Sequence, residues 1–152
     1  MTTIGAGNSG TNHQFSAGEL ASAPVMAVAL ATDALAALRI MRDNQIRHLP
    51  VVLDRRCLGM VSESAVLVAL AGAARGPLPT VYELCRRPAP FVRSTASRTD
   101  AARTMIDESC DALVVVDAND QVVGVLTAVD LVHSLAVPVN GDGAPAVVTT
   151  LE

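Results

Sequence analysis

Two stretches of the sequence decide the fold: MRDNQIRHLPVV at residues 41–52 and MIDESCDALVVV at residues 105–116. They align at an offset of 64 residues, with Met, Asp, Leu and two Val in matching places. The register extends in both directions: Pro24 matches Pro88 upstream, and after one extra residue Gly59 matches Gly124 downstream. Because similarity at a fixed period indicates a repeated supersecondary unit, the chain is predicted to hold two copies of one structural repeat.

Each repeat reads as helix, strand, strand and helix. In the first repeat, Thr32 or Asp33 can cap a helix that runs to about residue 44, with apolar residues at helical spacing. The elements that follow are a strand over 48–53, a turn over 54–56, a strand over 57–62 and a helix over 63–71.

The second repeat follows the same order. Ser97 begins a helix that is predicted to end near residue 109, and Asp100 completes an S-x-x-D capping box. Met41 and Met105 hold matching helical positions and are assigned to the core. The elements that follow are a strand over 112–116, a turn over 117–120, a strand over 122–127 and a helix over 129–136.

Two strings in these repeats resemble motifs of the cystathionine-β-synthase (CBS) domain family. Residues 46–52, IRHLPVV, are similar to its h-x-x-L-P-V-V strand, and residues 124–131, GVLTAVDL, are similar to its G-h-h-[ST]-x-x-D-h strand-to-helix turn. The resemblance covers about residues 18–136. It implies an α/β (α+β) fold in which two pseudo-symmetric β-α-β-β-α repeats pack as one intramolecular pair. It also implies clefts that bind adenosyl ligands such as AMP, ADP, ATP or S-adenosylmethionine.

The repeat and its breaker residues divide the chain into five segments. A length of 152 residues fits one compact domain or two small units that share a core. We expect a flexible tail at 1–17, a first CBS repeat at 18–71, a linker at 72–79, a second repeat at 80–136 and a flexible tail at 137–152.

The chemistry of one cleft can be argued from Thr127 and Asp130. Thr127 ends a strand and Asp130 lies three residues later, so the hydroxyl and the carboxylate are expected on the same side of the next helix. A carboxylate accepts two hydrogen bonds, which suits the 2′ and 3′ hydroxyls of a ribose. The helix N-terminus and Thr127 offer donors to a phosphate. A plainer interpretation stays open: Thr127 caps the helix, and Asp130 only stabilises its dipole.

The resemblance places the other half of this cleft on the first repeat. Its residues are Ile46, Arg47, His48 and Pro50, together with the segment 22–28. Arg47 and His48 would supply positive charge or donors for phosphate oxygens, and Ile46, Val28 and Val125 would sandwich the adenine. The alternatives are that Arg47 is a solvated charge at a strand edge and that His48 is a packed or surface histidine.

The pseudo-equivalent cleft, here called the twin cleft, differs in its polar residues. Ser62 keeps the hydroxyl, but Ala65 stands at the place of the carboxylate. On the opposite wall of the twin cleft we expect Asp111, whose charge would repel an anionic ligand. We therefore predict at most one nucleotide per chain.

Composition, net charge and missing motifs argue against several classes of function. The chain is 51% hydrophobic and 2% aromatic with a net charge of −4, so no nucleic-acid partner is expected. It contains no Lys, nucleophile elbow, P-loop or metal-ligand cluster, so neither an enzyme nor a bound metal is expected. Three cysteines without a C-x-x-C pair, no signal peptide and no apolar run long enough to span a membrane predict a cytoplasmic protein.

Two functions of different classes fit these observations. The first is a regulatory sensor that binds an adenosyl small molecule and passes its occupancy to a protein partner of unknown identity or to its own oligomer. The second is an interaction module that dimerises and binds partners without a small ligand. A homodimer is expected in either case, because residues 65–71 are apolar around the whole circumference of a helix.

Overall fold

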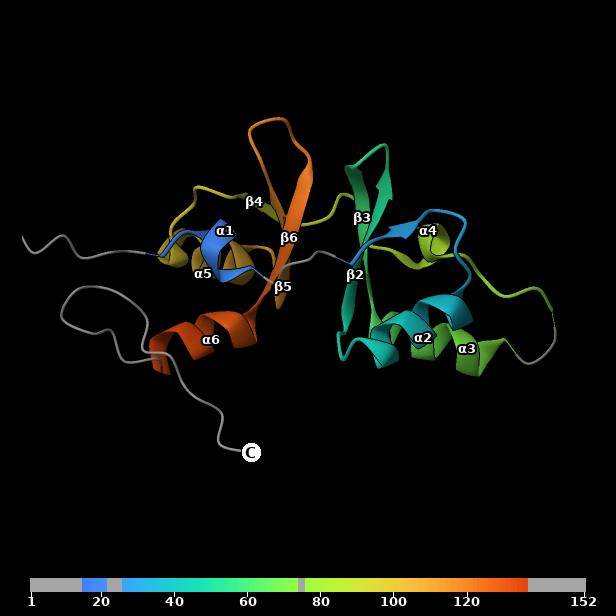
Figure 1. Ribbon diagram of the computed structural model, residues 1–152. Coiled ribbons are helices and arrows are strands. Elements are labelled where there is room, and N and C mark those ends of the chain that lie inside the picture. Colours follow the sequence, from blue (N-terminus) through green and yellow to red (C-terminus); the bar gives the residue numbers. More distant parts are fainter. Residues whose placement is uncertain (1–14, 22–25, 74–75, 137–152) are drawn as a thin grey trace, which may run out of the picture.

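The computed structural model describes residues 15–21, 26–73 and 76–136. In this part of the chain, two units share the order β-α-β-β-α, and each is built on a three-stranded sheet (Figure 1). The predicted fold class, a mixed α and β pair of repeats, is confirmed. The two tails that we expected to be flexible lie, over 1–14 and 137–152, outside the described residues.

The first unit follows the predicted order, preceded by a short strand. Its elements are β1 (Val28–Ala29), α2 (Ala34–Asp43), β2 (His48–Leu53), β3 (Arg56–Ser62) and α3 (Glu63–Gly72). Strand β2 is central, parallel to β1 and antiparallel to β3. Asp33 begins α2 as predicted, because its carboxylate accepts the N–H of Ala36 at 2.8 Å. The hairpin turn is tighter than expected, so β3 begins one residue early, at Arg56.

The second unit repeats this topology. Its elements are β4 (Phe91–Arg93), α5 (Arg98–Asp107), β5 (Ala112–Val116), β6 (Val122–Thr127) and α6 (Ala128–Ala136). The sheet order is β4-β5-β6, with β4 parallel and β6 antiparallel to β5. Ser97 accepts the N–H of Asp100 at 3.0 Å, which is the hydroxyl half of the predicted capping box.

A shared turn leads from the first long helix of each unit into its central strand. Gln45 (φ 54°) and Ser109 (φ 50°) both adopt the left-handed conformation that commonly ends a helix. The N–H of Ile46 then donates to the carbonyl of Met41 at 2.9 Å, and the second unit repeats this bond at 3.0 Å. The turn reverses the chain and brings the residues before β2 to the boundary between the two units.

Two short helices are exchanged between the repeats. Ala17 in α1 (Ala17–Leu20) is buried in the core of the second unit, and its N–H donates to Ala96 O at 2.8 Å. Val81 in α4 (Val81–Leu84) is buried in the core of the first unit, and its N–H donates to Thr32 O at 2.8 Å. The helix that opens each sequence repeat thus packs on the other repeat. Helix α1 also begins inside the segment that the sequence assigned to the N-terminal tail.

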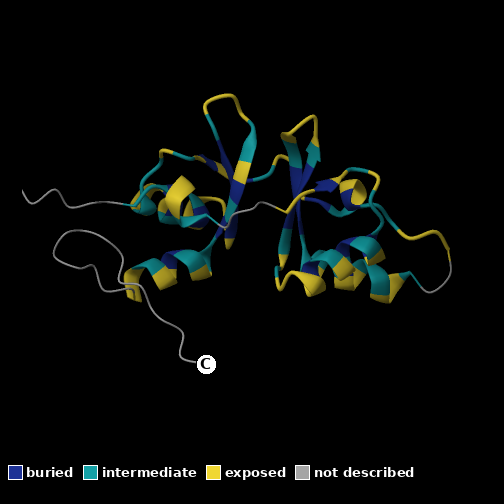
Figure 2. Cartoon of the chain, viewed as in Figure 1, coloured by how far each residue is buried: buried dark blue, intermediate teal, exposed yellow. Residues whose placement is uncertain are grey.

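The two sheets face each other across a shared apolar layer. Its buried residues are Met60, Ala112, Val114 and Val116. The N–H of Val122 donates to Arg55 O at 3.1 Å, which links the two hairpins directly. Figure 2 shows the buried residues along the facing strands and the exposed ones at the hairpin tips and outer helix faces. Met41 and Met105 lie in the two unit cores, as predicted.

Candidate functional site

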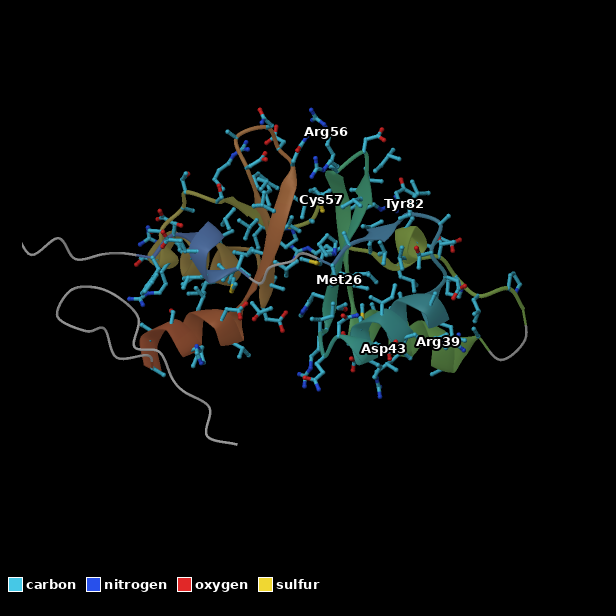
Figure 3. All side chains as sticks on the ribbon, in the orientation of Figure 1. Met26, Arg39, Asp43, Arg56, Cys57 and Tyr82 are labelled. Carbon is cyan, nitrogen blue, oxygen red and sulfur yellow. The ribbon has the colours of Figure 1, made fainter. Side chains whose placement is uncertain are left out.

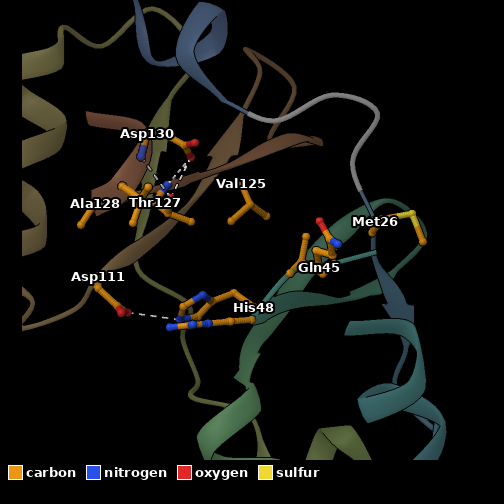
Figure 4. A pocket seen from close by; sticks show the side chains of 11 residues that line it. Met26, Gln45, His48, Asp111, Val125, Thr127, Ala128 and Asp130 are labelled. Carbon is orange, nitrogen blue, oxygen red and sulfur yellow. Dashed lines mark hydrogen bonds and ion pairs between the residues drawn. The ribbon is translucent and has the colours of Figure 1, made fainter. Parts of the chain in front are cut away.

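A pocket of about 430 Å³ opens between the two units, at the ends of their sheets (Figure 4). Such a volume lies in the usual range for small-molecule sites, about 300–1,000 Å³. The first unit lines it with the turn before β2, and the second unit with the end of β6 and the start of α6. The lining residues are Met26, Gln45, Ile46, Arg47, His48, Asp111, Val125, Thr127, Ala128, Val129 and Asp130.

Thr127 and Asp130 form a reciprocal hydrogen-bonded unit at the start of α6. Asp130 Oδ2 accepts the backbone N–H of Thr127 at 2.8 Å and its hydroxyl at 2.9 Å, and the N–H of Asp130 donates to Thr127 Oγ1 at 3.3 Å. The expectation that the two side chains share one side of the helix is confirmed. The same bonds also agree with the plainer interpretation, in which Thr127 caps the helix. The two are compatible, because both Thr127 bonds end on Oδ2 and Oδ1 keeps its acceptor capacity.

The opposite wall comes from the first unit. Ile46, Arg47 and His48 line the pocket, as the family resemblance implied. Arg47 is an exposed residue, whereas the side chain of His48 is only 15% exposed. His48 Nε2 lies 3.2 Å from Asp111 Oδ1 (Figure 4). Arg47 and the His48–Asp111 pair, which joins the two units, therefore line the same pocket.

The position of Asp111 corrects an expectation from the sequence. We expected this residue on the wall of the twin cleft, but it lines the pocket that contains Asp130. Its carbonyl accepts the N–H of Ala128 at 2.8 Å, which ties the start of β5 to the start of α6. The beginnings of β2 and β5 meet between the units, so the carboxylate reaches His48 of the other repeat.

Two other predicted site residues do not line the pocket. Val28 pairs with Val51 in the sheet and packs in the core of the first unit, with 4% of its surface exposed. Pro50 lies two residues into β2, opposite Met60, and is fully buried. Pro50 lies too deep in β2, because the pocket ends at the first residue of that strand, and Val28 is excluded because it pairs beside Val51, still further along β2. Val125, the third residue expected around the adenine with Ile46, does line it.

Four lining residues were not singled out from the sequence as site residues. Gln45, Ala128 and Val129 are direct neighbours of predicted ones, so the motifs carried the signal for them. Met26 falls within the segment 22–28 that the resemblance pointed to, and Figure 3 shows it between the two units. Residues 22–25 of that segment lie outside the described part of the chain.

The twin cleft has different chemistry at the equivalent positions. Ser62 caps α3 by accepting the N–H of Ala65 at 3.2 Å, and no carboxylate follows at the place of Asp130. The counterpart of Val125 is Met60, which is buried in the layer between the sheets. The two sets of equivalent residues are therefore unequal, since among the described residues the threonine–aspartate unit occurs in the second repeat and not in the first.

The comparisons with known proteins agree with this architecture. The CBS domain family model matches residues 17–72 and 81–143. The CBS domain pair of protein MJ0100, solved with 5′-methylthioadenosine and S-adenosyl-L-methionine, is 21% identical, covers 81% of this chain and 97% of its own, and gives a TM-score of 0.73. CBSX2 in complex with AMP is 24% identical, with coverages of 80% and 96% and a TM-score of 0.69. The cytosolic domain of the Mg²⁺ channel MgtE in complex with ATP is 25% identical, with coverages of 79% and 48% and a TM-score of 0.66.

The comparison with curated proteins finds no match. In the part of the chain that the structure describes, no helix has the length and apolar character needed to cross a membrane. The family match extends over most of the sequence and falls on the two repeats that the internal register defines. Sequence and fold together place the chain in the CBS domain family, as an intramolecular pair of CBS domains.

Proposed function

We propose that this CBS pair is a regulatory sensor that binds an adenosyl compound in the pocket between its repeats. The observation that carries the proposal is the convergence of two groups of residues from opposite repeats. Thr127 and Asp130 reach the pocket from the second repeat, and Ile46, Arg47 and His48 reach it from the first. Solved CBS proteins of the same fold hold 5′-methylthioadenosine and S-adenosyl-L-methionine, AMP or ATP.

Asp130 is the proposed ribose anchor. Its Oδ2 is held by two hydrogen bonds from Thr127, at 2.8 and 2.9 Å, so the carboxylate is oriented before a ligand arrives. Oδ1 keeps both of its lone-pair sites and can accept the two ribose hydroxyls. Ile46 and Val125 offer apolar contacts to the adenine from opposite repeats.

Sensing follows from the position of the pocket across two units. A ligand that contacts both the turn before β2 and the start of α6 stabilises one relative arrangement of the repeats. A protein partner or an oligomer contact that prefers this arrangement would therefore respond to the bound ligand. In this proposal the chain regulates and does not catalyse. The three cysteines are free thiols, which fits the proposed cytoplasmic location.

Thermal melting with a panel of adenosyl compounds, followed by calorimetry, tests the proposal. A ligand at 100 times its Kd should stabilise the protein by about 2.7 kcal/mol, which raises Tm by several degrees for a chain of this size. The expected stoichiometry is one ligand per chain, because Ala65 replaces the ribose anchor in the twin cleft. Absence of any shift across adenosine, 5′-methylthioadenosine, S-adenosylmethionine, AMP, ADP and ATP would reject the sensor.

We also propose that the chain is a homodimer, which the alternative interaction-module function requires as well. Apolar side chains stand exposed on two helices: Val68 on α3 (73%) and Val132 and Leu135 on α6 (65% and 69%). Both helices lie along the lower edge of the molecule in Figure 1, and exposed apolar side chains of this kind are typical of association surfaces.

Light scattering at tens of micromolar protein tests the dimer. Val68→Asp combined with Leu135→Asp should shift the mass to that of a monomer. Ile106→Asp is the matched control, because Ile106 is an equally exposed apolar residue (76%) on α5. A wild-type monomer, or equal dissociation by the control variant, argues against this face. A dimer that binds no adenosyl compound would support the interaction module instead.

A further inference from the structure

The side chains that line the pocket include more carboxylates than guanidinium groups. Arg47 is the one guanidinium among the described lining residues, and two carboxylates, Asp111 and Asp130, line the same pocket. His48 contributes no unopposed charge, because its Nε2 lies 3.2 Å from Asp111 Oδ1. With a protonated His48 the four groups sum to zero, and with a neutral His48 they sum to one negative charge. In neither state does the lining carry a net positive charge.

The two carboxylates have different partners in the pocket. Asp130 is held at the start of α6 by Thr127, while Asp111 lies at the start of β5 beside His48 (Figure 4). If Asp130 holds the ribose, the group attached at the ribose 5′ position lies within the same lining, which also contains Arg47 and the His48–Asp111 pair. This step rests on the proposed function. The 5′ substituent then meets a carboxylate as well as a guanidinium.

A pocket lined by both a guanidinium and a carboxylate complements an amino acid zwitterion better than it complements a phosphate. Arg47 suits a ligand carboxylate, because its planar fork binds such groups in a bidentate manner. Asp111 attracts an ammonium or sulfonium and repels phosphate oxygens. Its side chain is 77% exposed, so water and salt weaken the effect, and the discrimination is expected to be moderate and dependent on ionic strength.

We propose that the pocket selects adenosyl ligands by the charge of their 5′ substituent, with Asp111 as the specificity-determining residue. Ligands with a cationic aminoacyl-type 5′ group, of which S-adenosylmethionine is the probe, bind most tightly. The neutral 5′-methylthioadenosine follows, and the phosphates AMP and ATP bind more weakly in that order.

Calorimetry of the full chain at low and at physiological salt tests the order. S-adenosylmethionine should bind at least about tenfold more tightly than AMP at low salt, and the ratio should shrink as salt increases. Asp111→Asn should raise the affinity for AMP about tenfold and lower that for S-adenosylmethionine by a similar factor. The backbone bond between Asp111 and Ala128 does not involve the carboxylate, so the fold is retained.

Asp54→Asn is the matched control. It makes the same change of charge at an exposed hairpin residue outside the pocket lining, and asparagine tolerates its positive φ of 50°. This variant should leave the ratio of the two affinities unchanged. If the wild type binds AMP or ATP more tightly than S-adenosylmethionine, the charge-selection proposal is overturned but the sensor function stands. An unchanged ratio of the two affinities in Asp111→Asn has the same consequence. Failure of every adenosyl compound to bind, the uncharged ones included, overturns both.

Discussion

Replacing Asp130 with alanine removes a carboxylate that has two separable roles. In the free protein it accepts the N–H and the hydroxyl of Thr127, at 2.8 and 2.9 Å, and so completes the cap of α6. The bond from the Asp130 N–H to Thr127 Oγ1 survives the substitution, because it uses the backbone. Loss of a capping interaction costs about 0.5–2 kcal/mol, and each kcal/mol lowers Tm by about 2–4 °C for a chain of this size.

The effect on ligand affinity is expected to be larger than this structural cost and independent of it. Charged hydrogen bonds of the kind proposed between Asp130 and a ribose contribute about 1.5–3 kcal/mol. The corresponding loss of affinity is about ten- to a hundredfold in Kd. The residual binding would come from Ile46, Val125 and the polar wall at Arg47, which the substitution leaves in place.

Calorimetry with S-adenosylmethionine and AMP, run well below Tm, separates the two roles when a second cap is removed in parallel. Ser97→Ala deletes the hydroxyl that accepts the N–H of Asp100 at 3.0 Å at the start of α5, and Ser97 does not line the pocket. Both variants should melt at lower temperature, but only Asp130→Ala should lose affinity. If Asp130→Ala binds within about twofold of the wild type, the carboxylate is a helix cap and not a ribose anchor. Equal losses of affinity in both variants would assign the effect to stability.

Two further predictions concern Gly59 and the thiol of Cys57. A Cβ at Gly59 would lie 2.6 Å from Cys85 Sγ and 2.7 Å from Arg86 O, so Gly59→Ala should destabilise the protein by about 1–3 kcal/mol in chemical denaturation. Gly72→Ala, where the added Cβ meets nothing within 4 Å, should be neutral or slightly stabilising, and equal midpoints would refute the packing argument. Burial raises the pKa of the Cys57 thiol to about 11, so its alkylation at pH 8 should be on the order of a hundredfold slower than that of a free thiol. The folded state holds the Cys57 proton more tightly than the unfolded chain does. The stability that this proton contributes is therefore complete below the ordinary thiol pKa and is lost as the pH rises through 11. Between pH 8 and pH 10.5, Tm should fall less in Cys57→Ala than in the wild type.

The order of elements could be predicted because its signals are local. The internal register fixed two equivalent units, and cap residues such as Asp33 and Ser97 begin their helices where the sequence indicated. The polar part of the pocket was predictable for the same reason. Thr127 and Asp130 are joined by one helical turn, and Arg47 and His48 are adjacent in sequence.

The features that the sequence did not predict depend on distant contacts. How far the pocket extends along β2 is set by packing against β3, so Pro50 could be placed on the strand but not recognised as buried core. The exchange of α1 and α4 between repeats leaves no trace in the linear order, because a short helix satisfies its caps locally and is apolar on one side in either arrangement. The burial of Ala17 and Val81 in the opposite cores, and their backbone hydrogen bonds to the opposite repeat, reveal it.

Asp111 shows why pseudo-symmetry alone does not assign a charge to a cleft. The offset of 64 correctly equates Asp111 with Arg47, and each residue belongs to the turn that begins the central strand of its sheet. These two turns meet between the units, as the contact of Asp111 with His48 demonstrates. A residue at this meeting point can therefore line the pocket that contains the helix start of its own repeat. The acidic residue in the second repeat therefore alters the charge of the pocket that contains Asp130, and on our proposal the ligand class depends on the pair of repeats and not on either motif alone.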